Sequence, residues 1–280
     1  MLLALDVGNT NTVVGVFDGA DLKAHWRLST RRAGTSDEYG IFVKSLFDFA
    51  GLDFRAINAV ILSTVVPTVQ GPLEEMSRQF FGVEAMVVGP GLKSGMPILY
   101  ETPREVGADR IVNAVAAFEL YGGPCIVVDF GTAATFDAIS ARGEYLGGAI
   151  CPGIGISAEA LFQRAAKLPR VDIARPKSVI GRTTVTSIQS GLYFGYLGLV
   201  EGLVARMREE LGGSAKVIAT GGQAGLLLAD SPLVDHLDPW LTLTGLRHHF
   251  TQHALAASCV NRFVHIRQSN AKRLNREMAK

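Results

Sequence analysis

The chain has 280 residues, of which 48% are hydrophobic and 19% are charged, and its formal net charge at pH 7 is +1. This composition excludes a disordered chain and provides enough apolar residues for one large domain or two ordinary ones. A net charge so close to zero gives no general electrostatic basis for binding nucleic acid or a membrane surface, and neither partner is expected.

Cysteine usage and hydropathy favour a reducing compartment. The cysteines Cys125, Cys151 and Cys259 are odd in number and widely spaced, so neither a disulfide framework nor a zinc-ligand pair follows from them. The apolar N-terminus has no basic flank and is interrupted by Asp6, which argues against a signal peptide. No apolar run reaches the roughly 18 residues that span a bilayer. A cytoplasmic protein is therefore expected.

The chain opens with two apolar segments, residues 2–5 and 13–17, on either side of a short polar turn. This pattern predicts a hairpin that places the carboxylate of Asp6 at the rim of a buried sheet. The turn is rich in amide and hydroxyl donors, and Gly8 permits a close approach of the backbone to a ligand. Such a loop suits a phosphate chain with a bridging cation near Asp6. A plain hairpin with Asn-rich turn chemistry explains the same residues equally well by themselves.

The next elements predict a mixed sheet covered by helices. A third antiparallel strand is expected at 24–30, and a helix with Ser36 as its N-cap is expected to end at Gly51. Residues 59–66 form a β-branched run without alternation, which is typical of a strand buried on both faces. Pro67 then starts a helix to about residue 81, and a short strand follows at 84–88.

A loop over residues 89–103 leads into a helix that is predicted from Thr102 to Tyr121. Thr102 as N-cap, a proline at the first helical position and Glu105 three residues after the cap form a capping-box signature. Glu105, Asp109 and Asn113 are spaced four apart and would share one helix face. The small residues before Asp109 leave room for a ligand at its carboxylate. The alternative is an ordinary surface pair of Asp109 with the arginine that follows it.

The opening motif returns at residues 125–139. An apolar strand ends in Asp129, Gly131 and Thr132 follow, and a second apolar strand begins. The order matches that of Asp6, Gly8 and Thr10 in the first hairpin. Two such hairpins imply a duplicated fold with a nucleotide between its halves.

The remaining elements complete the second half. A strand at 145–150, a glycine-rich turn opening a helix to about residue 165, a loop at 168–186 and a long helix at 186–211 are expected. Glycines recur along the long helix, which indicates close packing against another helix, either of this chain or of a partner chain. Residues 216–225 read as a strand, the tight turn of Gly221 and Gly222, and a helix start where a nucleotide can bind. A basic tail follows residue 255.

Four motifs in this order resemble those of the type III pantothenate kinases, within the sugar kinase/Hsp70/actin superfamily: Asp6-Val-Gly-Asn-Thr-Asn11, Gly107-Ala-Asp-Arg110, Asp129-Phe-Gly-Thr132 and Thr220-Gly-Gly-Gln223. The resemblance covers about residues 1–250. It implies an α/β fold of duplicated ribonuclease-H-like (actin-like ATPase) domains, each a mixed sheet flanked by helices. We expect an N-terminal domain at 1–115, a C-terminal domain at 116–255 and the basic tail at 256–280.

The resemblance also implies a reaction, the ATP-dependent phosphorylation of pantothenate to 4′-phosphopantothenate, which begins coenzyme A biosynthesis. Asp109 matches the catalytic carboxylate that accepts the proton of the pantothenate hydroxyl. Asp129 matches the ligand of a monovalent cation, K⁺ or NH₄⁺, and Asp6 matches a residue that helps to place Mg²⁺.

Further residues match contacts with ATP and with the acceptor. The implied nucleotide contacts are Asp6, Val7, Gly8, Asn9, Thr10, Asn11, Thr12, Val13, Thr132, Gly221 and Gly222. The implied substrate contacts are Tyr100, Gly107, Ala108, Asp109, Arg110 and Thr184. Because Thr184 matches a contact made by the neighbouring subunit, the resemblance implies a homodimer.

Two alternatives remain open at this point. One is a non-catalytic transcriptional accessory protein on the same scaffold, for which the basic tail is the only support. The other is a different small-molecule kinase of the superfamily. The three carboxylates at 6, 109 and 129 favour catalysis, because a pure binding module would not need all of them.

Overall fold

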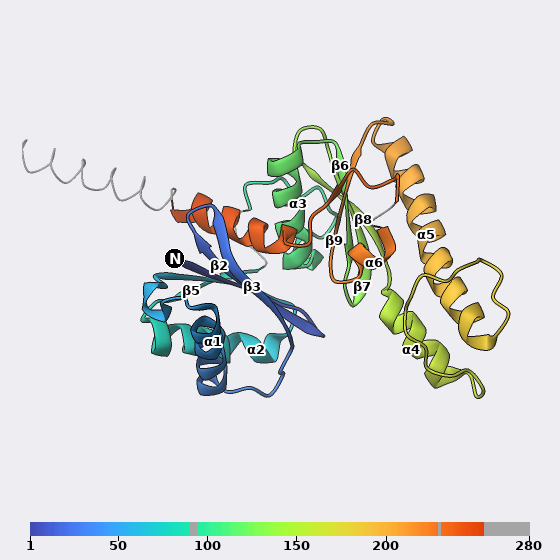
Figure 1. Ribbon diagram of the computed structural model, residues 1–280. Helices are drawn as coiled ribbons and strands as arrows, with labels where there is room; N and C mark the ends of the chain where they lie inside the picture. The colour runs from blue at the N-terminus through green and yellow to red at the C-terminus, as the bar shows by residue number, and fades with distance from the viewer. Residues whose placement is uncertain (90–93, 229–230, 255–280) are drawn as a thin grey trace, which may run out of the picture.

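The computed structural model describes residues 1–89, 94–228 and 231–254. Two α/β lobes lie side by side, and each is built on a five-stranded mixed sheet with helices on its faces (Figure 1). The predicted pair of mixed sheets flanked by helices is confirmed. In the described residues no helix is both long enough and apolar enough to cross a membrane.

The first lobe contains residues 2–88. Its strands are β1 (Leu2–Val7), β2 (Asn11–Asp18), β3 (Asp21–Ser29), β4 (Ala59–Thr64) and β5 (Ala85–Val88), in the order β3-β2-β1-β4-β5. β1 pairs antiparallel with β2 and parallel with β4, which turns a hairpin meander into a mixed sheet. The helices α1 (Ser36–Ala50) and α2 (Pro67–Met76) cover one face and bury residues such as Leu3, Phe47 and Met76.

The second lobe repeats the first strand for strand. β6 (Cys125–Phe130), β7 (Ala133–Ile139), β8 (Tyr145–Pro152), β9 (Lys216–Thr220) and β10 (His236–Leu237) lie in the order β8-β7-β6-β9-β10. β6 pairs antiparallel with β7 and parallel with β9, as β1 does with β2 and β4. Asp6 and Asp129 each occupy the fifth position of their central strand. The duplication predicted from the two hairpins is therefore a structural one.

The helices of the second lobe lie on both faces of its sheet. α4 (Ile154–Arg164), α5 (Thr184–Glu210) and α6 (Ala224–Leu228) pack on one face, and α3 (Ala108–Tyr121) packs on the other. The α3 residue Val112 also belongs to the core of the first sheet, so α3 links the two lobes.

The last described helix, residues 241–254, returns to the first lobe (Figure 1). Its Leu243 and Leu246 are buried with Phe17 on the face of the first sheet opposite α1 and α2. A Cβ at Gly245 would lie 2.4 Å from the carbonyl oxygen of Val112, so glycine is required where this helix approaches α3.

Two predicted helix starts are wrong. Helix α1 is capped by Thr35, not Ser36, and Thr35 forms a reciprocal capping box with Glu38. Thr102 caps nothing through its side chain, because only the short 3₁₀ helix Pro103–Glu105 follows it and α3 begins after Gly107. The chain is extended at Val106, whose side chain is buried in the core. Glu105 therefore does not share the helix face of Asp109 and Asn113.

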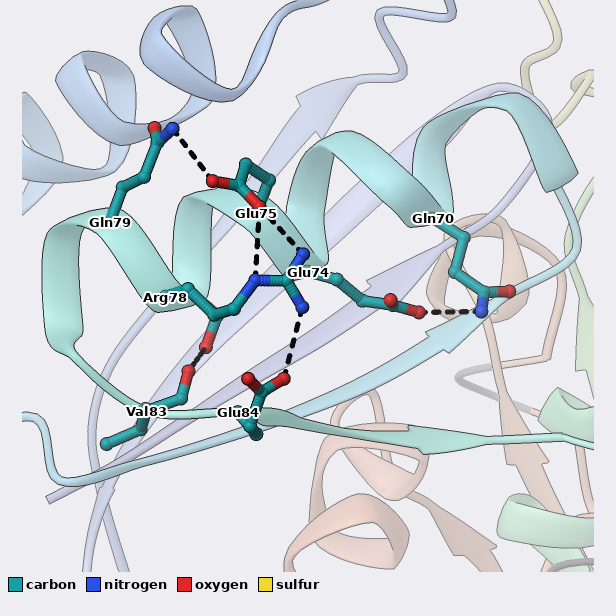
Figure 2. Close-up of polar contacts among 8 residues, drawn as sticks. Gln70, Glu74, Glu75, Arg78, Gln79, Val83 and Glu84 are labelled. Carbon is teal, nitrogen blue, oxygen red and sulfur yellow. Dashed lines mark hydrogen bonds and ion pairs between the residues drawn. The ribbon is translucent and has the colours of Figure 1, made fainter.

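A surface network closes the end of α2, which continues into the π-helical turn Ser77–Phe81 (Figure 2). Arg78 pairs with Glu75 at 2.7 Å and with Glu84 at 3.1 Å, at the start of β5. The Ser77 hydroxyl donates to the Val83 carbonyl at 2.7 Å. Exposed ion pairs of this kind are screened by solvent, so the network fixes the local turn and adds little stability.

Some predictions fall outside the described residues: the basic tail at 256–280, Cys259 and part of the loop at 89–103. Cys125 and Cys151 are free thiols.

Candidate active site

Three carboxylates meet in a cavity of about 330 Å³ between the lobes, which we call the acidic cavity. Asp6 comes from β1, Asp129 from β6 and Asp109 from the first turn of α3. The wall is completed by the loops that follow β1 and β6, by the glycine turn after β9 and by the segment at 239–243. The structure thus brings together three aspartates that are far apart in the sequence.

A second cavity, of about 630 Å³, adjoins the first and shares Asn11, Thr132 and Gly222 with it. Its remaining lining comes mainly from α4 and from Gln223. The two cavities together form a cleft, of which one part holds the three aspartates and the other is lined by both loops, by α4 and by Gly222 and Gln223 just before α6.

The two loops touch at their tips. The Oγ1 atoms of Thr10 and Thr132 lie 3.0 Å apart and share a hydrogen bond. Each loop is closed by its own glycine, since the Gly8 amide donates to the Asn11 carbonyl at 2.9 Å and the Gly131 amide donates to the Ala133 carbonyl at 3.0 Å. Both turns are thus closed by a glycine amide, although the first bond spans three residues and the second spans two.

Glycines let neighbouring backbone approach the second loop. Gly221 has φ +92°, and a Cβ there would lie 2.4 Å from Asp129 Oδ1. A Cβ at Gly153 would lie 2.4 Å from the carbonyl oxygen of Thr132. Both positions need glycine because a side chain would displace the loop or the carboxylate.

Burial and mutual repulsion make the aspartates reluctant to ionise. Desolvation, followed by the charges of Asp109 and Asp129, raises the pKa of Asp6 to about 8. Desolvation and Asp109 raise the pKa of Asp129 to about 7. Burial also raises the pKa of Asp109, and the Arg110 backbone amide, which donates to its Oδ1 at 2.9 Å, opposes that shift. The cavity is therefore set to receive positive charge.

Arg27, on β3, is the one lysine or arginine among the described residues that line these two cavities. Its charge lowers the pKa of Asp6 and of Asp129 in opposition to their burial. Arg27 was not singled out from the sequence. Its position opposite Val13 in the strand pairing is the signal that could have found it, because Val13 is the third residue of β2 and lies close to the first loop.

The protein offers few oxygen ligands for a cation in the acidic cavity. Within the described ranges no three His, Cys, Asp or Glu side chains stand close enough to hold one metal ion. Asn113 donates from Nδ2 to Asp129 Oδ2 at 3.0 Å, and its buried Oδ1 has no hydrogen-bond partner. Asn113 is 1% exposed and lines neither cavity, so a Mg²⁺ or monovalent cation at Asp129 would take most of its ligands from phosphate and water oxygens.

Only some of the residues predicted to contact the acceptor lie at the acidic cavity. Gly107 precedes Asp109 at the start of α3, and a Cβ on it would lie 2.5 Å from Asp109 Oδ1. Arg110 turns away from the acidic cavity and pairs with the buried Asp137, while Tyr100 packs beside Tyr145. Neither Asp137 nor Tyr145 was singled out from the sequence.

Thr184 lies apart from the aspartates. It lines an open cavity of about 890 Å³ at the start of α5, with Gly181, Arg182 and Thr183, and no aspartate of the acidic cavity belongs to that lining. Within one chain, Thr184 is therefore not brought to Asp109.

Two equivalent lobes whose Asp-x-Gly loops meet over an acidic cavity form a duplicated α/β fold of the actin-like ATPase and sugar kinase type. Solved structures share this fold: a Baf family transcriptional activator from Campylobacter jejuni (TM-score 0.57, 18% identity, covering 90% of this chain and 98% of that one) and the activator of 2-hydroxyisocaproyl-CoA dehydratase from Clostridium difficile with bound ADPNP (TM-score 0.50, 12% identity, covering 92% and 97%).

Sequence comparison identifies the family within this fold. The family model for type III pantothenate kinase matches residues 2–206. Type III pantothenate kinases from Myxococcus xanthus and Anaeromyxobacter sp. are 60% and 61% identical to it over 247 residues, which cover 88% of this chain and 96% and 97% of theirs. The chain belongs to the type III pantothenate kinase family, and the predicted assignment to a kinase is confirmed.

Proposed function

We propose that this protein transfers the γ-phosphoryl group of ATP to the hydroxyl of pantothenate and so forms 4′-phosphopantothenate, the first step of coenzyme A biosynthesis. The observation that carries the proposal is the position of Asp109. Its carboxylate faces the same cavity as the loops after β1 and β6, where a nucleotide's phosphates would lie. Phosphoryl transfer depends mostly on positioning and on charge neutralisation, which this arrangement supplies.

Asp109 would act as the general base for the acceptor hydroxyl. It is the second residue of α3, where the backbone amides favour an ionised carboxylate, and the Arg110 amide already donates to it. Burial raises its pKa, which increases its affinity for the hydroxyl proton as the phosphoryl group arrives.

The loops would hold ATP, and the other two aspartates would hold its counterions. The predicted nucleotide contacts that line the cleft are Asp6, Gly8, Asn9, Thr10, Asn11, Val13, Thr132, Gly221 and Gly222, which supports a nucleotide site there. Val7 is instead buried in the core of the first lobe, and Thr12 lines a separate cavity. Asp6 would help to place Mg²⁺, and Asp129, with the free oxygen of Asn113, would bind K⁺ or NH₄⁺. These cations would neutralise charge on the phosphates and on the buried aspartates.

A homodimer would complete the acceptor site. The glycines 191, 195 and 198 of α5 are exposed, and no atom of the described chain would touch a Cβ on any of them. Ile180 and Val185, near Thr184, are also exposed. A second copy packed here could carry its Thr184 to the pantothenate bound near Asp109.

Domains at 1–115 and 116–255 and a cytoplasmic location are also proposed, with the domain boundary inside α3, the helix that links the lobes, and with residues 241–254 packed back on the first sheet. The strand repeat supports the two domains, and the free thiols of Cys125 and Cys151 suit a reducing compartment.

The direct test is ADP release in the presence of pantothenate and Mg²⁺, with K⁺, with NH₄⁺ and with neither. We expect turnover that requires pantothenate and is strongly stimulated by a monovalent cation. Asp129→Asn should lose that stimulation. Faster phosphorylation of a sugar or of acetate would instead favour another kinase of the superfamily, and DNA binding without turnover would favour the regulatory alternative.

Intersubunit complementation tests the shared site. Asp109→Asn and Thr184→Asp should each be inactive as homodimers, the second because its charge repels the pantothenate carboxylate. Co-expressed, they should regain activity at about a quarter of the sites, because each mixed dimer contains one site with both native residues. Mixed dimers that form and remain inactive would show that Thr184 does not serve the neighbouring subunit.

A further inference from the structure

A buried cluster of Arg110, Asp137 and Tyr145 lies between α3 and the second sheet. The Arg110 Nε donates to Asp137 Oδ1 at 2.8 Å, and its Nη2 lies 2.6 Å from the same oxygen. The Tyr145 hydroxyl also donates to that oxygen, at 2.6 Å. Asp137 and Tyr145 are fully buried, and Arg110 is 8% exposed. One carboxylate oxygen thus holds both an arginine and a tyrosine.

The guanidinium of Arg110 is only half used by this contact. Asp137 engages the edge formed by Nε and Nη2. Nη2 meets it as an ion pair but has no aligned hydrogen-bond partner, and within the described residues Nη1 makes no hydrogen bond. A guanidinium is a planar fork with five donors, so a second edge remains for a planar anion.

The cluster extends in two directions. Thr135, which lines the acidic cavity, donates to Asp137 Oδ2 at 3.3 Å. On the other side the ring of Tyr145 lies 5.9 Å from the Arg110 Cζ and 6.4 Å from the ring of Tyr100. Tyr145 therefore lies next to both Arg110 and Tyr100, two predicted acceptor contacts.

The position of Arg110 indicates which end of the acceptor it would contact. Asp109 lines the acidic cavity, whereas Arg110, the next residue of the helix, lines neither that cavity nor its neighbour. Successive helix side chains point about 100° apart, so Arg110 faces away from the loops where the phosphates would lie. An acceptor whose hydroxyl reaches Asp109 would present its far end, the carboxylate, on this other side.

We propose that Asp137 and Tyr145 are positioning residues that hold the free edge of the Arg110 guanidinium against the carboxylate of pantothenate and thereby select an anionic acceptor. This inference rests on the proposed function. Because Asp137 fixes one edge of the planar group, the other edge is already oriented when the acceptor arrives, and a bidentate contact then costs little ordering entropy. Burial and the charge of Asp137 raise the pKa of Tyr145, so its hydroxyl stays protonated and keeps donating.

The test compares Asp137→Asn and Tyr145→Phe with the wild type. Kinetics are measured with pantothenate, with ATP and with pantothenol, in which a primary alcohol replaces the carboxylate. We expect KM for pantothenate to rise roughly tenfold in Tyr145→Phe and further in Asp137→Asn, as for loss of a charge-assisted hydrogen bond. KM for ATP and kcat should change little, and the preference for pantothenate over pantothenol should fall by the same factor as pantothenate affinity.

The matched control is Tyr121→Phe. Its hydroxyl also donates to a carboxylate, Asp238 at 3.0 Å, but at the far end of α3. This control should change neither KM nor the acceptor preference. Thermal unfolding separates misfolding from lost recognition, and Tyr145→Phe decides the question if Asp137→Asn does not fold.

Two outcomes would overturn the proposal. If both variants keep the wild-type KM for pantothenate, Arg110 needs no positioning by this cluster. If they lose pantothenate and pantothenol equally, the cluster does not read the carboxylate. Either result leaves the proposed kinase intact, whereas a wild type without pantothenate-dependent turnover contradicts the proposed function itself.

Discussion

Asp109→Asn is expected to lower kcat for pantothenate phosphorylation by roughly 10²- to 10⁴-fold, the range for loss of a general base. The amide has nearly the same shape and keeps its place at the start of α3, but it cannot accept the hydroxyl proton. KM for ATP should change little, because the loops after β1 and β6 remain intact. Coupled measurement of ADP release under saturating ATP and pantothenate reads out the change.

The control for this substitution is Asp37→Asn. Asp37 is also the second residue of a helix, α1, but it is exposed and lines neither cavity of the cleft. It should therefore retain wild-type turnover. If Asp109→Asn also turns over at the wild-type rate, another group removes the proton, and the role proposed for Asp109 is wrong.

The second large effect concerns stability without ligands. The pKa of Asp6 is about 8 in the folded protein and near 3.8 in a solvated chain, and that of Asp129 is about 7. Between these values the folded state binds more protons than the unfolded state, so the free energy of unfolding falls as pH rises. We expect the loss to begin near pH 4 and to be complete once pH passes about 8. Its slope should be of order 1 kcal/mol per pH unit.

Urea unfolding at several pH values between 5 and 8, without nucleotide, measures this slope. Asp6→Asn and Asp129→Asn should each flatten it and should be more stable than the wild type at pH 8, although both lose activity. The exposed Asp21→Asn is the control and should leave the slope unchanged. A wild-type stability that stays level across this range would show that the aspartates are already compensated in the folded protein.

The pH dependence of stability has a consequence for nucleotide binding. The ionised carboxylates of the acidic cavity repel one another, and cations bound with ATP would offset that repulsion. Binding of the nucleotide with its cations would therefore stabilise the fold most at the higher pH values.

Local sequence patterns predicted much of the fold. Alternation, β-branched runs and turn residues depend on neighbours in the chain, so both hairpins, the buried strand at β4 and the helices α1, α2 and α5 were found within a few residues of their observed bounds. The first residues of the helices were predicted less accurately. Thr35 caps α1 and Thr102 caps no helix, because the burial of Val106 keeps the chain extended where the sequence pattern alone favours a helix.

By itself, then, the sequence determined the family, the repeated Asp-x-Gly turns and the three carboxylates, because these are carried by residue type and short-range spacing. Only the tertiary structure decided that Asp6, Asp109 and Asp129 face one cavity. It also brought Arg27 to that cavity, joined Arg110 to Asp137 and Tyr145, and returned residues 241–254 to the first sheet. These contacts join residues far apart in the chain, and their partners are selected by strand order and helix packing, which no local pattern encodes.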